Sequence, residues 1–121
     1  MSYVDGFLLP VPEKNVAAYR RLARKAGKVW LEHGALEFRE CMADDLDTPM
    51  GAIFRKAVAC KRGEVVFYSF IVYKSRAQRD KVNAKVMKDP RLAAMMAGNE
   101  MPFDTRRMAF GGFKAVVDLA R

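Results

Sequence analysis

The chain has 121 residues, 51% of them hydrophobic, and its 22 Lys and Arg outnumber 14 Asp and Glu, which gives a formal net charge of +8. This length predicts a single domain over 1–121 that buries about two-thirds of the surface its unfolded chain exposes. The hydrophobic content excludes an intrinsically disordered protein, and no apolar run approaches the ~20 residues of a membrane span. With Cys41 and Cys60 as its two cysteines, the chain is not a disulfide scaffold. Because the N-terminus also lacks the basic head of a secretory signal, we expect free thiols and a cytoplasmic protein.

The first half of the chain predicts a strand, a helix and a second strand. Residues 3–11 are rich in β-forming side chains. The period of the hydrophobic residues over 12–33 predicts an amphipathic helix, and Gly34 follows it as a C-terminal cap. Alternation over 35–42 predicts a half-solvated strand. Residues 43–63 show no period and are long for a connection, so they are expected to be functional or to hold unrecognised structure.

The second half opens on the clearest strand, which is apolar on both faces and is therefore expected at the centre of a sheet. Ser75 and Gln78 form a capping box at the start of a helix, and Asp89 with Pro90 starts a shorter one that stops at Gly98. Gly111 and Gly112 suggest a bulge or a close backbone approach. The elements predicted here are, in order, a strand over 64–73, a helix over 75–88, a short helix over 89–97, a loop over 99–105 and a strand over 107–119.

The resulting order is β-α-β-β-α-β, which predicts an α+β, ferredoxin-like fold with a four-stranded antiparallel sheet. Both helices then cover one face of the sheet. The first, third and last strands carry apolar side chains on both faces, so the uncovered face is an exposed apolar surface of a kind that usually marks an interface. We therefore expect a homodimer in which two such faces pack together around a two-fold axis.

Four blocks of the sequence resemble a known family: VDGFLLPVP (4–12), AGKVWLEHGALEFREC (26–41), SRAQRDKVNAKVMKDPR (75–91) and MPFDTRRMAFGGF (101–113). They are similar to domain-of-unknown-function family 1428, a small bacterial family of uncharacterised conserved proteins within the dimeric α/β-barrel superfamily. The resemblance implies a ferredoxin-like fold and a dimeric α/β barrel, and it implies no established reaction. The wider superfamily includes cofactor-free monooxygenases and haem-degrading enzymes, some of which use an Asn and a Trp to activate oxygen.

His33 is the single histidine and lies on the apolar arc of the first helix, one turn beyond Trp30. One interpretation makes His33 a general base or a ligand-orienting group in a pocket between helix and sheet. The other makes it a buried histidine that bonds a carbonyl and closes the helix. Trp30 is interpreted in the same two ways, as a core residue or as a pocket wall.

The second helix places two polar residues, Arg79 and Asn83, among its sheet-facing residues Val82, Val86 and Met87. A buried Arg or Asn is costly unless it is paired, so each needs a protein partner or a bound ligand. The candidate protein partners are Asp5, Glu37 and Asp104. The functional alternative is a site for an anion or a carbonyl, with Arg79 and Asn83 as hydrogen-bond donors.

The excess positive charge comes from two segments, 13–28 and 74–91, which each carry a net charge of +5. They form basic stripes on the two helices and leave an RNA-binding protein as one alternative, although no aromatic stacking motif accompanies them. The lone histidine and the distant cysteines match no metal-ligand spacing, so we expect no metal and no cofactor.

The leading functional prediction is a protein that binds a small organic molecule in a helix–sheet pocket. Its candidate residues are Trp30, His33, Arg79 and Asn83. An enzyme of the monooxygenase or isomerase kind is the second alternative, with His33 as the base and with Arg79 and Asn83 orienting an oxyanion.

Overall fold

The structure of this chain is a computed structural model that describes residues 2–47, 49–51, 53–97 and 101–121. Its elements are, in chain order, β1 (Tyr3–Pro12), the 3-10 turn η1 (Glu13–Asn15), α1 (Val16–Glu32), β2 (Glu37–Met42), α2 (Phe54–Ala57), β3 (Glu64–Tyr73), α3 (Arg76–Met87), α4 (Pro90–Met96), the 3-10 turn η2 (Thr105–Arg107) and β4 (Ala109–Lys114). In this part of the chain, no helix is both long and apolar enough to cross a membrane.

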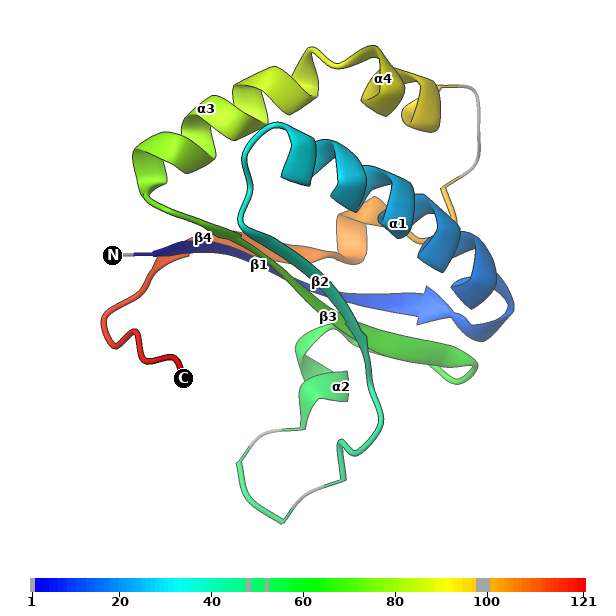
Figure 1. Cartoon of the computed structure of the whole chain (residues 1–121). Helices are drawn as coiled ribbons and strands as arrows, with labels where there is room; N and C mark the ends of the chain where they lie inside the picture. Colours follow the sequence, from blue (N-terminus) through cyan, green and yellow to red (C-terminus); the bar gives the residue numbers. More distant parts are fainter. Residues whose placement is uncertain (1, 48, 52, 98–100) are drawn as a thin grey trace.

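The four strands form one antiparallel sheet with the order β2-β3-β1-β4. Helices α1, α3 and α4 cover one face of the sheet, whereas α2 and the C-terminal segment lie on the other side (Figure 1). The predicted ferredoxin-like fold is confirmed, and β3, the strand predicted to be central, lies between β2 and β1.

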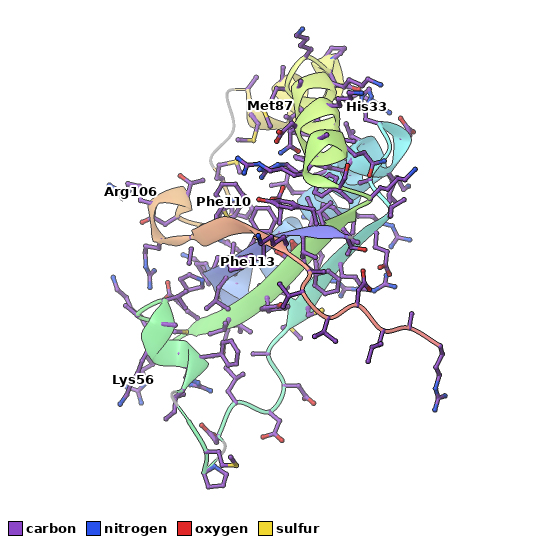
Figure 2. All side chains as sticks on the ribbon, turned by 90° about the vertical axis from the view of Figure 1, so that its left-hand side faces the viewer. His33, Lys56, Met87, Arg106, Phe110 and Phe113 are labelled. Carbon is purple, nitrogen blue, oxygen red and sulfur yellow. The ribbon has the colours of Figure 1, made fainter. Side chains whose placement is uncertain are left out.

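Alternation along the strands separates a helix-covered face from an uncovered one. On β1, Leu9 is buried beneath the helices. The register pairs Phe7 with Phe110 and Val4 with Phe113, so the two phenylalanines of β4 lie on opposite faces (Figure 2). Phe7 and Phe110 stack with ring centroids 5.1 Å apart on the helix-covered face. The apolar side chains of both faces are thus distributed as the sequence predicts.

The predicted caps are present at the helix ends. The backbone N–H of Gln78 donates to Ser75 Oγ at 3.1 Å, which is one half of the expected capping box. The Asp89 carboxylate accepts the backbone N–H of Arg91 at 2.9 Å and begins α4. Gly34 ends α1 with φ +116°, a conformation that a side chain would strain.

The last strand is shorter than predicted. β4 ends at Lys114 rather than at residue 119, because its partner β1 begins at Tyr3 and offers nothing further to pair with. The N–H of Ala115 donates to the carbonyl of Ser2 at 2.9 Å as the final sheet contact. Residues 115–121 therefore leave the sheet. The two glycines of β4 pair with Gly6 and Asp5 in continuous register, so no bulge is present there, and it is the Tyr3 side chain rather than another backbone that lies close to Gly112.

Other boundaries also differ. β1 continues through Pro12, which pairs with Glu64, so the first helix begins at Val16 instead of at the proline. The segment without a period contains the short helix α2, which four residues are too few to reveal as a period. The expected stop at Gly98 and the start of the following loop lie outside the described residues. Both cysteines are free thiols, as expected.

The Arg107–Glu64 ion pair connects the segment before β4 to the start of β3. Two guanidinium nitrogens of Arg107 lie 2.6 and 2.9 Å from the carboxylate, and these hydrogen bonds lower the pKa of Glu64 from 4.5 to about 2. The folded state therefore favours the charged carboxylate. The resulting stabilisation is complete above pH 4.5 and is lost as the pH falls toward 2.

We expect Glu64→Gln to lower the free energy of unfolding by about 1 kcal/mol at neutral pH, and to remove this part of the pH dependence. Urea unfolding at neutral pH and at several pH values between 4.5 and 2 measures both effects. Glu37→Gln is the control, because the Glu37–Arg39 pair is exposed. An acid-dependent loss of stability that is the same in both variants would contradict the prediction.

Candidate functional site

A cavity of about 460 Å³ lies between the helices and the covered face of the sheet. Its walls are aromatic rings from both layers together with methionines from the α3–α4 side. They include Phe7, Trp30, Phe38, Met95, Met101 and Phe110. Met87, predicted to face the sheet, is 64% exposed and lies at the edge of this cavity. Of the four predicted site residues, Trp30 and Asn83 line the cavity, whereas His33 and Arg79 do not.

Asn83 connects α3 to α1 and to the sheet. Its Oδ1 accepts the indole N–H of Trp30 at 3.1 Å and the hydroxyl of Tyr73 at 3.2 Å. These two donors fix the orientation of the amide, because only its oxygen can accept them. Within the described residues, the Nδ2 of Asn83 makes no hydrogen bond, so the protein does not use its two N–H donors.

Arg79 is satisfied by protein atoms. Its guanidinium lies 2.8 Å from the carboxylate of Asp5 on β1 and 2.8 Å from that of Asp80. It also lies over the ring of Tyr3, 4.8 Å from the centroid. Asp5, one of the three expected partners, is only 1% exposed. The pair therefore connects α3 to β1, one of the two inner strands of the sheet.

His33 is the residue that follows α1, and its Nε2 lies 2.8 Å from the carboxylate of Asp89 at the start of α4. The partner is a side chain rather than the backbone carbonyl that the second interpretation expected. Hydrogen bonds from Arg91 and then from His33 lower the pKa of Asp89. Met87 and His33 lie on opposite sides of α3 (Figure 2), and of the two only Met87 lines the cavity. His33 thus connects two helices away from the cavity.

Sequence reasoning missed Glu40 and Tyr19, which line the cavity together. The Tyr19 hydroxyl on α1 lies 2.8 Å from each carboxylate oxygen of Glu40 on β2. Burial raises the pKa of Glu40, and the hydrogen bonds from Tyr19 and Ser69 oppose that rise. A signal was present in the sequence: residues 38 and 40 point to the same side of a strand, so Glu40 shares its side with the apolar Phe38.

The comparisons with known proteins agree with this fold. The family model described as "Protein of unknown function (DUF1428)" matches residues 2–105. The chain is 43% identical over 118 residues to the uncharacterized protein YbaA of Escherichia coli K12, covering 98% of this chain and 99% of that protein.

Two solved structures are similar in fold. A dimeric ferredoxin-like protein from an uncultured marine organism has a TM-score of 0.59 and 12% identity, with 98% of this chain and 100% of that chain covered. SnoaB of Streptomyces nogalater, a cofactor-independent oxygenase, has a TM-score of 0.54 and 14% identity, with 99% and 98% covered. At 12% and 14% identity, these two structures show only that the fold is similar. The family model and the similarity to YbaA show the family to which the chain belongs. The chain therefore belongs to the DUF1428 family of proteins of unknown function.

Proposed function

We propose that this protein binds a small, largely aromatic molecule that carries a hydrogen-bond-accepting oxygen in the cavity between the helices and the sheet. The observation that carries the proposal is the Asn83 amide, which lines a largely apolar cavity and whose Nδ2 makes no hydrogen bond within the described residues. Small-molecule sites commonly combine a cavity of roughly 300–1,000 Å³ with a few oriented polar groups. We further propose a cytoplasmic location, where Cys41 and Cys60 stay reduced.

The residues of the walls support this class of ligand. Trp30 and Phe38 offer ring faces, and Met95 with Met101 offers side chains that adapt to an irregular shape. The Asn83 amide would then select a carbonyl or phenolic oxygen over a bare hydrocarbon. Naphthol and naphthalene differ in this one oxygen, and are the probes of choice.

We expect Ala26→Phe to weaken naphthol binding at least about tenfold, because Ala26 lines the cavity and a phenyl ring there occupies the space of the ligand. Isothermal titration calorimetry measures the change. Ala17→Phe is the matched control, since Ala17 is on the exposed side of α1. Naphthol binding that survives in the Ala26→Phe variant, or that is no tighter than naphthalene binding in the wild type, would contradict the proposal.

An oxidative reaction on such a ligand is the second candidate function. Its support is the Trp30–Asn83 hydrogen bond beside the cavity, together with the likeness in fold to a cofactor-independent oxygenase. Consumption of dissolved oxygen with naphthol, lost in the Ala26→Phe variant, distinguishes catalysis from binding alone.

We infer that a second copy of the chain covers the uncovered face of the sheet. Tyr68 and Phe113 on this face are 49% and 64% exposed, and a fold neighbour is itself described as dimeric. Phe113→Glu is expected to give the mass of one chain in size-exclusion chromatography with light scattering, because an unpaired charge in an apolar interface is costly. Leu31→Glu on α1 is the control. A wild-type mass of one chain at micromolar concentration would refute the dimer.

A further inference from the structure

We propose that the cavity selects ligands that carry a protonated amine on their aromatic body, and that Glu40 is the residue that binds the ammonium group. The inference rests on the proposed function and adds the charge of the ligand to it. Three observations support it: Glu40 is the one carboxylate among the described residues that line the cavity, the hydroxyl of Tyr19 bonds that carboxylate, and aromatic rings lie beside it.

The cavity and the protein surface have opposite charge. Arg39 and Glu40 are the two formally charged residues among those that line the cavity in the described part of the chain. Arg39 lies opposite Phe70 on the uncovered face, and its guanidinium bonds Glu37 at 3.1 Å. Glu40 lies opposite Ser69 on the helix-covered face. A protein of net charge +8 therefore directs a single negative side chain toward this cavity.

Glu40 retains capacity to accept hydrogen bonds. The hydroxyls of Tyr19 and Ser69 donate to its carboxylate, which offers about four lone-pair positions. In the structure as described, no cationic side chain forms an ion pair with it. Charged groups do face it from α1 across a second, neighbouring hollow between α1 and β2. These are Arg20, Arg24 and Lys28.

A half-buried carboxylate that has hydroxyl donors but no ion-pair partner within the described residues is costly, and the raised pKa of Glu40 reflects its burial. A ligand ammonium would supply the missing positive charge as a charge-assisted hydrogen bond. The ring of Tyr19 lies edge-on to that of Phe103, with centroids 5.4 Å apart, and both rings line the cavity. Aromatic faces beside a carboxylate are a favourable environment for an organic cation.

The test compares naphthylmethylamine with naphthylmethanol, which differ in charge at neutral pH but hardly in size. We expect calorimetry to give at least about tenfold tighter binding of the amine to wild-type protein, and about equal binding of the two probes to Glu40→Gln. The glutamine keeps one oxygen that can accept the Tyr19 hydroxyl, replaces the other oxygen with an NH2 donor and removes the charge. Glu37→Gln on the same strand and the uncovered face is the matched control, expected to keep the amine preference.

The possible results separate this inference from the proposed function. If naphthylmethanol binds and the amine binds no tighter, or if Glu40→Gln keeps the preference, the role of Glu40 is refuted while the cavity remains a ligand site. If neither probe nor naphthol binds the wild type, the proposed function fails and the inference fails with it. A circular dichroism melt of each variant shows that a lost preference is not a lost fold.

Discussion

Replacing Asp5 with alanine is expected to lower the free energy of unfolding by about 3–5 kcal/mol, the largest effect of a single substitution that we predict. Asp5 is 1% exposed, and its carboxylate lies 2.8 Å from the guanidinium of Arg79. Removing Asp5 takes away the buried partner of Arg79 and leaves its guanidinium with the exposed carboxylate of Asp80, which costs more than the Asp5–Arg79 pair itself contributes. Guanidinium chloride unfolding followed by circular dichroism measures this loss.

Two further variants make that prediction specific. Asp5→Leu combined with Arg79→Met is expected to be more stable than Asp5→Ala, because an apolar pair of similar volume leaves no buried charge. Asp104→Ala is the control, since the Asp104–Arg106 pair is largely exposed. A loss below about 1 kcal/mol for Asp5→Ala would show that the pair is solvated. The double variant should still bind naphthol, because Arg79 does not line the cavity.

Replacing Gly27 with alanine is expected to destabilise the protein by about 1–3 kcal/mol, although the same change inside an exposed helix stabilises by up to about 1 kcal/mol. Gly27 is in the middle of α1, and a Cβ placed there would lie 2.7 Å from Cδ1 of Phe38 on β2. The contact reaches the inner part of the ring, so the ring cannot avoid it by a small movement of its tip. Thermal and urea unfolding show whether Gly27→Ala lowers or raises the free energy of unfolding.

A second substitution tests this cause. Phe38→Leu removes the ring atoms, so Gly27→Ala in that background should cost much less than in the wild type. The difference between the two costs is the interaction energy of the pair. Gly27→Ala that stabilises the wild-type protein would mean that the helix can move away from the sheet.

The order of the elements and the faces of the strands were predictable because their causes are local. Period reports which side of a helix is buried, and it correctly placed Val82 and Val86 on the sheet-facing side of α3. Caps are local as well, which is why the Ser75–Gln78 and Asp89 signals identified the starts of α3 and α4.

The candidate site was harder to predict because its partners are distant in the chain. Asn83 and Trp30 are 53 positions apart, and the sequence shows the need for a partner without showing which one satisfies it. His33 and Arg79 are satisfied by carboxylates, Asp89 and Asp5, so the residues with the most obvious chemistry are turned away from the cavity. The end of β4 was likewise hard to predict, because it is set by the start of β1, a strand that is distant in the sequence.

Helix α4 has a consequence for how molecules reach the cavity. It buries no residue fully, yet its Leu92, Met95 and Met96 form one cavity wall. Two side-chain contacts connect the first turn of α4 to the end of α1. Asp89 bonds His33, and Arg91 lies 2.5 Å from Glu32. Such a segment has a small free energy of local opening compared with the sheet. If the cavity holds a ligand as proposed, we expect its exchange to follow the opening of this seven-residue helix while the sheet stays folded.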